Sequence, residues 1–366
     1  MSLEAWLNRA WYGPDGPRWW LAPGSALYGA ACALRETAYR RQWLHSSRLA
    51  RPVVVVGNLS VGGTGKTPLV GWLAARLAER GLHPGVVTRG YGGTLRGERL
   101  VTPEDDPAVV GDEAVLLARR LALPVAAGRN RAAAAQRLVD FGCDVIVSDD
   151  GLQHTALGRD CEILVIDGER GFGNGRLLPA GPLREPITRL GNVDAVVVNG
   201  GGEGVAVPGV PPGAGPPAFR MRLEASRAVA LAAGPASASL HGAERPLASF
   251  AGTSVHAVAG IGNPDRFFAM LRAQGMAVRG HALADHARIA AGDILFADAE
   301  PVLMTEKDAV KCGAGSRGAG GGGAVPDARH WYVPVDVRFT EAAAAALLEI
   351  VMGKITAAAP ARNTRG

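Results

Sequence analysis

The chain has 366 residues, of which 48% are hydrophobic and 20% are charged, and its formal net charge is +5. This length allows two domains, and the composition is typical of a globular protein with a substantial core. The mild basic excess comes without a Lys-rich run or an aromatic-interleaved basic motif, which argues against a nucleic-acid partner. The four cysteines are scattered, with no Cys-x-x-Cys pair, which argues against structural zinc and favours a reducing compartment.

Residues 1–45 form an aromatic and basic segment, in which five of the seven tryptophans fall within the first 43 residues. Its uncharged stretch, 19–34, has 16 residues and contains Pro23. A membrane-spanning helix needs about 20 apolar residues, so this stretch is too short to cross a bilayer. The charged residues Glu4 and Asp15 argue against a signal peptide. Aromatic surface followed by arginines predicts a segment that lies in a membrane interface against anionic lipid. Packing as a helical cap on the core is the alternative.

A glycine-rich loop follows the valine run 53–56, which predicts a buried strand, and precedes a helical run over 69–80. Such a loop wraps backbone N–H groups around a polyphosphate, and Lys66 and Thr67 would contact the outer phosphates and Mg2+. Glycine usually stands where Ser60 does, so the loop departs from the common pattern. An ordinary glycine-rich turn is the alternative, but it leaves Lys66 unexplained. The residues predicted to hold the nucleotide are Ser60, Val61, Gly62, Gly63, Thr64, Gly65, Lys66 and Thr67.

Strand-like and helix-like segments alternate after this loop, which predicts a parallel sheet covered by helices on both faces. The predicted strands are 84–88, 123–126, 144–148, 162–167 and 194–199. Ligands of such sheets bind beyond the carboxyl ends of the strands. The phosphate loop and the motifs RGYGG and DDGLQH all begin at strand ends, so we expect them to meet in one crevice.

The stretch 200–217 is rich in Gly and Pro and predicts a linker, after which a second α/β unit begins. The glycine-dense stretch 313–324 predicts a mobile insertion, and a terminal helix is expected over 340–352. We therefore divide the chain into an N-terminal segment (1–45), a phosphate-loop core (46–205), a second α/β lobe (206–353) and a disordered tail (354–366).

Asp149 and Asp150 follow the strand 144–148, where phosphate-loop enzymes carry a second magnesium-binding acid. One carboxylate would hold the metal directly or through water. A helix cap or a turn is the alternative role for these acids. Gln153 and His154 on the same turn could orient water or substrate, and structural hydrogen bonding is the alternative for both.

Asp112 and Glu113 open a predicted helix, where acidic residues complement the helix dipole. A kinase needs an acid that accepts or steers the proton of the attacking hydroxyl, and aspartate commonly fills this place. Because an aspartate has a pKa of about 3.9, a histidine could help to receive the proton. His286 is the candidate, with a purely structural role as the alternative. The arginines that could contact anions, or lie at the surface, are Arg89, Arg129 and Arg131.

Taken together, these motifs resemble the tetraacyldisaccharide 4'-kinase family, the lipid A 4'-kinases of Gram-negative bacteria. The shared motifs, in order from residue 56 to residue 311, are VGNLSVGGTGKTP, TRGYGG, VGDEA, SDDGLQH, GIGNPDRF, ADH and MTEKDAVK. The resemblance implies transfer of the γ-phosphate of ATP, with Mg2+, to the 4'-hydroxyl of tetraacyldisaccharide 1-phosphate, giving lipid IVA in lipid A biosynthesis. It also implies a P-loop-containing parallel sheet, a second smaller Rossmann-like α/β lobe, and a peripheral location on the cytoplasmic face of the bacterial inner membrane.

The resemblance also implies roles for single residues of this chain. Lys66 and Thr67 match the phosphate and magnesium contacts, Glu113, Asp149 and Asp150 match the metal and active-site acids, and Asp112 and His286 match the catalytic pair. The family often reads Phe-Pro-Asp-His-His at the last site. This chain has Leu-Ala-Asp-His-Ala over 283–287, so Asp285 and His286 remain and the second histidine is absent.

A membrane-associated P-loop ATPase switch of the partitioning or metal-insertion type is the alternative function. Such switches use a similar GGxGKT loop, but they carry a lysine immediately before the glycine pair. Val61 occupies that place here. A kinase needs an acid that activates the acceptor, which Asp112 supplies, whereas a switch would need dimerisation surfaces that the sequence does not show. A third alternative, a pure nucleotide-binding scaffold, would leave the second acid cluster without a role, so the sequence favours the kinase.

Overall fold

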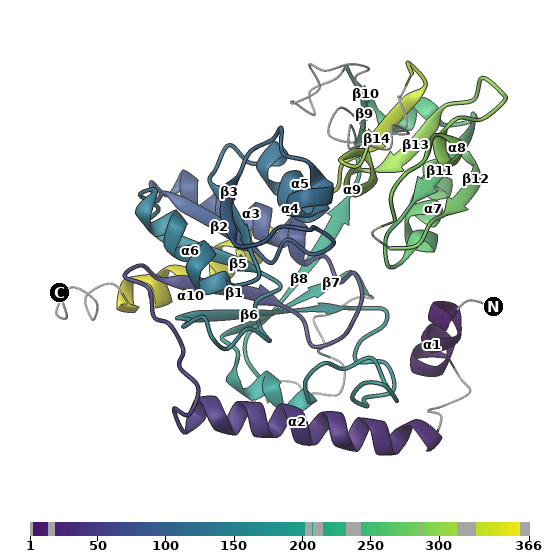
Figure 1. Cartoon of the computed structure of the whole chain (residues 1–366). Helices are drawn as coiled ribbons and strands as arrows, with labels where there is room; N and C mark the ends of the chain where they lie inside the picture. The colour runs from purple at the N-terminus through teal and green to yellow at the C-terminus, as the bar shows by residue number, and fades with distance from the viewer. Residues whose placement is uncertain are drawn as a thin grey trace.

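The computed structural model describes residues 3–13, 19–201, 207, 215–231, 243–285, 287–312 and 327–358 (Figure 1). The predictions made for His286, for most of the linker 200–217, for the stretch 313–324 and for residues 359–366 lie outside the described residues. The described chain builds two α/β units, each around its own sheet.

The larger sheet has nine strands in the order β15-β8-β7-β6-β1-β5-β2-β4-β3. Neighbouring strands pair in parallel from β8 to β4, and the edge strands β3 and β15 are antiparallel. The prediction of a mainly parallel sheet is therefore confirmed. The strands are β1 (Val53–Gly57), β2 (Pro84–Thr88), β3 (Glu98–Val101), β4 (Val125–Gly128), β5 (Val145–Asp149), β6 (Cys161–Asp167), β7 (Ala195–Asn199), β8 (Ala218–Glu224) and β15 (Asp336–Arg338).

Both faces of this sheet are covered, which explains why its central strands are continuous apolar runs and are buried along their whole length. One core lies between the sheet and the helices α3 (Lys66–Glu79), α5 (Asp112–Arg120) and α10 (Glu341–Ala358). The other lies under α6 (Arg131–Asp140) and the segment that includes η2 (Ile187–Asn192). The short helix α4 (Pro107–Val110) precedes α5.

The second sheet has six strands in the order β10-β9-β14-β13-β11-β12, of which β11 to β14 pair in parallel. Its strands are β9 (Arg227–Ala230), β10 (Glu244–Pro246), β11 (Ser254–Ala259), β12 (Ala277–Ala282), β13 (Val302–Thr305) and β14 (His330–Val333). The accompanying helices are η3 (Leu247–Phe250), α7 (Pro264–Ala273), α8 (Ala291–Ile294) and α9 (Glu306–Ala309). This is the smaller Rossmann-like lobe that the sequence predicted.

The chain crosses between the two sheets twice, and the boundaries differ from those we expected. β8 ends at Glu224 and β9 begins at Arg227, while β14 ends at Val333 and β15 begins at Asp336. β8, β15 and α10 therefore belong to the first sheet, although we assigned 206–353 to the second lobe. Each crossing takes only two residues, so no linker composition marks it.

The terminal helix α10 also continues to Ala358, beyond the point where we expected the tail to begin. Leu347, Val351 and Ile355 are buried in the first core. Because these residues follow one another at four-residue spacing, they keep one face of the helix on the core. In Figure 1 this yellow helix lies against the first sheet, far in sequence from the strands it covers.

The N-terminal segment forms α1 (Leu3–Tyr12), η1 (Trp19–Leu21) and α2 (Ala22–Arg40). α2 runs along the outside of the first lobe in Figure 1 and has no buried residue. Side chains on one side of it bond the segment 177–185: Ser25 Oγ donates to Leu177 O at 2.7 Å, and Tyr28 Oη donates to Arg184 O at 3.0 Å. Among the described helices, none is both long enough and apolar enough to cross a membrane.

Candidate active site

The phosphate loop leaves β1 and ends where α3 begins at Lys66. Gly62 and Gly65 have positive φ angles of 107° and 92°, a region that L side chains rarely adopt. A Cβ on Gly65 would also approach the Asn199 side chain to 2.7 Å, whereas one on Gly62 would meet nothing within 4 Å. A glycine-rich loop that leads into the N-terminus of a helix of 14 residues is suited to a polyphosphate.

Thr67 and Asp149 form the part of the site that suits Mg2+. Thr67 Oγ1 donates to Asp149 Oδ2 at 3.0 Å, and Asp149 is 1% exposed. Its other oxygen, Oδ1, is buried without a hydrogen-bond partner. Burial, assisted by the Glu113 carboxylate, raises the pKa of Asp149 to about 7. A buried carboxylate oxygen without a partner, next to a hydroxyl, is a fitting environment for a divalent cation with oxygen ligands.

Asp150 has a different environment, although it is the next residue. Arg184 binds it in a bidentate manner, with Nη1–Oδ2 at 3.0 Å and Nη2–Oδ1 at 2.8 Å, and Lys66 Nζ lies 3.7 Å from Oδ1. Arg131, itself buried, donates to the Asp150 carbonyl at 2.6 Å. Burial acts to raise the pKa of Asp150, but the three cations outweigh it and hold the pKa well below its usual range. Asp150 thus anchors cations of the protein around the phosphate loop.

Asp112 and Glu113 form the first turn of α5, as predicted, and face the second lobe. Asp112 is 5% exposed, and its Oδ1 accepts from the Glu113 N–H at 2.9 Å. Lys307 Nζ of α9 lies 4.0 Å from Asp112 Oδ2 and 3.4 Å from Glu113 Oε1. Lys311 Nζ lies 3.8 Å from the same Asp112 oxygen. Two ammonium groups of the second lobe therefore meet the acid pair of the first.

Asp285 completes this junction from the loop after β12. Lys307 Nζ lies 3.3 Å from Asp285 Oδ1. Burial acts to lower the pKa of Lys307, but the carboxylates of Glu113, Asp112 and Asp285 outweigh it and raise the pKa above its usual value. Lys307 is therefore charged at neutral pH and binds acids from both lobes.

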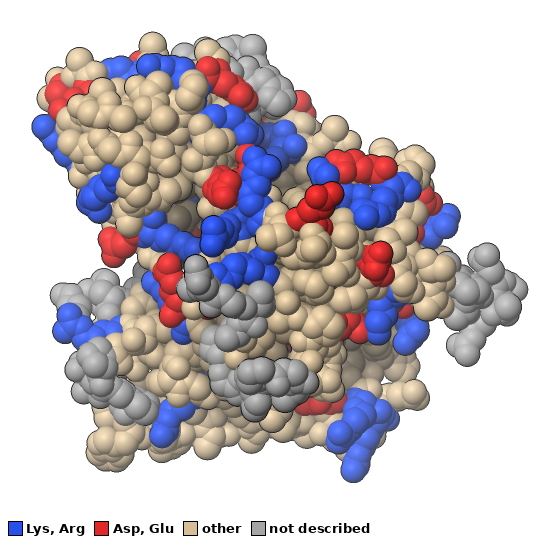
Figure 2. All heavy atoms as spheres, turned by 180° about the vertical axis from the view of Figure 1, so that it is seen from behind, with Lys and Arg blue, Asp and Glu red and all other residues tan. Residues whose placement is uncertain are grey.

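The loop after β11 brings the second lobe to the phosphate loop. A Cβ built on Gly262 would lie 3.4 Å from the Gly63 nitrogen and 3.6 Å from Asp285 Oδ2. Asp308 Oδ2 accepts from the Gly260 N–H at 2.9 Å, which ties this loop to α9. Figure 2, from behind, shows Lys and Arg side chains gathered where the two lobes meet. The phosphate loop, the Asp112 pair and the Asp285 loop therefore converge at one place.

The other predicted residues lie around this centre to different degrees. Gln153 Nε2 donates to the Asn58 carbonyl at 3.0 Å, behind the phosphate loop. Burial, together with nearby arginines, lowers the pKa of His154 to about 4, so its ring is neutral at pH 7. Arg89 and Arg129 are exposed. Gln153 thus has at least a structural role. His154 is neutral, so it does not bind an anion as a positively charged group.

Three residues of the junction were missed as functional residues, namely Arg184, Lys307 and Lys311. The two lysines belong to the MTEKDAVK motif, and the helix start after β13 was a signal that could have placed them at the sheet's carboxyl edge. Arg184 offered no such signal, because its segment forms no strand or helix.

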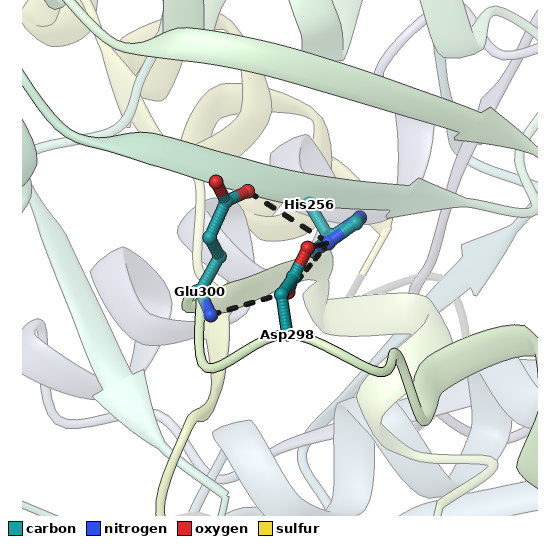
Figure 3. Close-up of side chains that lie close together, drawn as sticks. All are labelled: His256, Asp298 and Glu300. Atoms are coloured by element: carbon teal, nitrogen blue, oxygen red, sulfur yellow. Dashed lines mark hydrogen bonds and ion pairs between the residues drawn. The ribbon is translucent and has the colours of Figure 1, made fainter.

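A second polar cluster lies in the second sheet (Figure 3). His256 Nε2 lies 3.1 Å from Asp298 Oδ1 and 3.8 Å from Glu300 Oε2, close enough together to hold a metal ion. However, Arg279 already pairs with both carboxylates, at 2.9 and 3.3 Å, and the His256 ring stacks on Phe296 at 3.7 Å. We therefore interpret the cluster as a closed ion-pair network that fastens the 298–300 loop to the sheet.

Comparison with known proteins shows which family has similar sequences and a similar fold. The LpxK family model, described as Tetraacyldisaccharide-1-P 4'-kinase, matches residues 17–352. A Tetraacyldisaccharide 4'-kinase of Nitrosococcus oceani is 46% identical over 347 residues, which cover 94% of each chain. One from Halorhodospira halophila is 50% identical over 320 residues, covering 87% of this chain and 88% of the relative.

A similar solved structure is a crystal structure of LpxK from Aquifex aeolicus in complex with ATP. It matches with a TM-score of 0.71 and 27% sequence identity, covering 92% of this chain and 98% of that chain. The similarity therefore extends over both lobes.

Proposed function

Because the chain belongs to the tetraacyldisaccharide-1-P 4'-kinase family, we propose that its phosphoryl transfer takes place where the phosphate loop, Asp112 and the second lobe meet. The chain is an ATP-dependent kinase of lipid A biosynthesis that phosphorylates the 4'-hydroxyl of tetraacyldisaccharide 1-phosphate. The alternative, a membrane-associated ATPase switch, is not favoured, since the family match spans residues 17–352.

The main support for this location of the site is that residues of both lobes converge there. Gly262 packs against the phosphate loop and lies close to Asp285. Lys307 in turn joins Asp285 to Asp112 and Glu113. A γ-phosphate held by the loop would thus lie next to an acid that can act on an acceptor hydroxyl, the arrangement that phosphoryl transfer requires.

In this proposal Lys66 contacts the outer phosphates, and Thr67 and Asp149 hold Mg2+, with Glu113 as a further acid of the metal site. When bound, Mg2+ neutralises negative charge on the phosphate oxygens. Asp149 is the better direct ligand, because its Oδ1 has no partner while the Asp150 carboxylate is held by Arg184. Asp150 then orients Lys66.

Asp112 is proposed to accept or steer the proton of the 4'-hydroxyl as the oxygen attacks phosphorus. Its first-turn position on α5 and its burial hold the carboxylate at a fixed place between the lobes. His286, the expected partner of Asp112, stays a prediction from the sequence, next to Asp285 in the chain.

The direct test supplies labelled ATP and tetraacyldisaccharide 1-phosphate in detergent micelles. We expect label to appear in a bis-phosphorylated lipid, because the acceptor hydroxyl takes the γ-phosphate. Release of labelled phosphate without a labelled lipid would instead support the ATPase switch. A reaction without the disaccharide is the control for background hydrolysis.

We further propose that α2 and its flanks lie on the membrane surface that presents the lipid, at the cytoplasmic face of the bacterial inner membrane. Trp19 is 82% and Leu27 is 75% exposed, and Leu34 and Trp43 are also largely exposed. Amphipathic rings with neighbouring arginines favour an interfacial position. Tyr28 on the same helix bonds Arg184 O, so the membrane-facing element is connected directly to the site.

Replacing Trp19, Trp20 and Leu27 together with serine is expected to reduce binding to vesicles that contain anionic phospholipid. The reason is the loss of apolar surface, since each exposed side chain contributes roughly 25 cal/mol per Å2 that it buries in the interface. Co-sedimentation measures the effect. Phe141→Ser, which removes an exposed aromatic outside the N-terminal segment, is the matched control. If the triple variant sediments as the wild type does, η1 and α2 are not the anchor.

A further inference from the structure

The chain obtains its positive charge almost entirely from arginine, with 35 arginines and four lysines. Three of the four lysines, Lys66, Lys307 and Lys311, lie at the acids of the proposed site. The fourth, Lys354 on α10, pairs with Asp194, the residue before β7. An ammonium is a compact point charge, whereas a guanidinium is a planar fork, so the two are not interchangeable. In this arginine-rich chain, we interpret the three lysines at the site as marking places that require the compact charge.

Lys307 is the lysine whose surroundings explain that requirement best. Its ammonium lies within 4.0 Å of carboxylates on Asp112, Glu113 and Asp285, which approach it from two lobes. Its side chain is 17% exposed. An arginine guanidinium that pairs with one carboxylate in its plane would displace the other two carboxylates. An ammonium can instead donate hydrogen bonds in three directions.

Lys311 has a different task, although it lies one turn further along the chain. Its Nζ lies 2.9 Å from Asp308 Oδ1 and 3.8 Å from Asp112 Oδ2. Asp308 also accepts from the Gly260 N–H at 2.9 Å and from the Thr305 hydroxyl at 2.5 Å. Lys311 thus forms its shortest contact inside the second lobe and a longer one with Asp112, whereas Lys307 reaches Asp285 as well as both acids of the first lobe.

The other end of the contact between α5 and α9 does not involve lysine. Arg120, at the C-terminus of α5, donates to Glu306 at 2.9 Å, to Val335 O at 2.7 Å and to Asp336 at 2.5 Å. Glu306 opens α9, and Asp336 lies at one of the two chain crossings. Arg120 therefore joins the lobes without Lys307, and the Arg227–Asp336 and Arg266–Asp167 ion pairs, at 2.8 and 3.3 Å, join them as well.

We propose that Lys307 is a positioning residue for the phosphoryl transfer: its ammonium fixes the Asp112 carboxylate against the Asp285 loop, so that the acceptor-activating acid is assembled from both lobes. The proposal rests on the kinase function given above. Without this cation, Glu113 and Asp285 would lose the counter-charge that they share with Asp112, and Asp112 would keep only Lys311, 3.8 Å from its Oδ2. Repulsion among the carboxylates and the incoming polyphosphate would then turn Asp112 away from the acceptor.

Lys307→Ala tests the proposal, with Lys354→Ala as the matched control at the ion pair on α10. We expect kcat to fall by about 10- to 100-fold, the scale of misplacing a reacting group, while the KM for ATP changes little. Ethylammonium added to Lys307→Ala is expected to restore part of kcat, and guanidinium is expected not to. The kcat of Lys307→Arg should be intermediate, because the guanidinium restores the positive charge but not the compact geometry of the ammonium.

Hydrogen exchange supplies a readout apart from activity. In Lys307→Ala, the protection of α9 is expected to stay as in the wild type, because Arg120 still holds the lobes, and Arg120→Ala is the variant expected to lose that protection. The proposal is overturned if Lys307→Ala keeps its kcat, if arginine restores it fully, if no ammonium restores it, or if α9 loses protection. A wild-type enzyme that fails to phosphorylate the disaccharide would refute the proposed function instead.

Discussion

Replacing Lys66 with alanine is expected to lower turnover by at least ~100-fold, the scale of losing a preorganised charge contact in a transition state. The lysine opens α3 directly after the glycine loop, and its side chain is 13% exposed. Its Nζ lies 3.7 Å from Asp150 Oδ1, an anchor that aims the ammonium along the loop. Charge that develops on the transferred phosphoryl group would therefore lose its nearest fixed cation.

The fold should survive this change, because Asp150 keeps its bidentate contact with Arg184 when Lys66 is removed. Steady-state transfer of labelled phosphate to the lipid measures the effect, and thermal unfolding checks the fold. Lys354→Ala serves again as the control, since it removes an ion-paired lysine far along the chain. Phosphorylation near the wild-type rate by the Lys66 variant would refute the assignment of the phosphate loop.

The phosphate loop could be predicted in detail because its signals are local. The valine run, the glycines and the Lys-Thr pair lie within 15 residues, from 53 to 67. The unusual serine, by contrast, is explained by contacts with a segment far along the chain. Ser60 forms an antiparallel bridge with Leu183, and the Val61 N–H donates to Pro182 O at 2.9 Å. Because this part of the loop is held extended, it does not need the glycine that the common pattern has at position 60.

The acid pairs were predictable for a related reason. Asp149 ends β5, where the rule that ligands gather at the carboxyl edge of a parallel sheet predicted it, whereas Asp112 was predicted from its place in the first turn of a helix. The rule could not predict their different environments. Arg184 is 34 residues from Asp150 in the chain, and only the folded segment 177–185 brings them together.

The division into lobes was the part that sequence could least reveal. β8 pairs with β7 and β15 pairs with β8, so strand pairing assigns them to the first sheet, while their sequences look like those of any other short strand. The same holds for Lys307, whose partners come from residues 112–113 and 285. Contacts between lobes depend on where two chain crossings fall, and each crossing is two residues long.

Asp112→Asn is expected to lower kcat by roughly 10^2- to 10^4-fold, the range for losing a group that transfers a proton in the transition state. The dissociation constant of ATP should change little, because the contacts of Asp112 described above involve α5 and α9 and not the loop 60–67. Asparagine keeps the oxygen that accepts from the Glu113 N–H, so the first turn of α5 should stay intact. Single-turnover kinetics and nucleotide binding, measured separately, distinguish the two effects.

The control for Asp112→Asn is Asp106→Asn, which makes the same chemical change six residues earlier. Asp106 caps α4 by accepting from the Ala108 N–H at 2.8 Å, and asparagine caps helices equally well. We therefore expect the control to keep both activity and stability. If Asp112→Asn weakens ATP binding in proportion to its loss of turnover, Asp112 acts on the nucleotide, and the role in activating the 4'-hydroxyl is wrong. If turnover alone falls, the acid acts on the acceptor, which explains why the site is built from two lobes rather than from the phosphate loop alone.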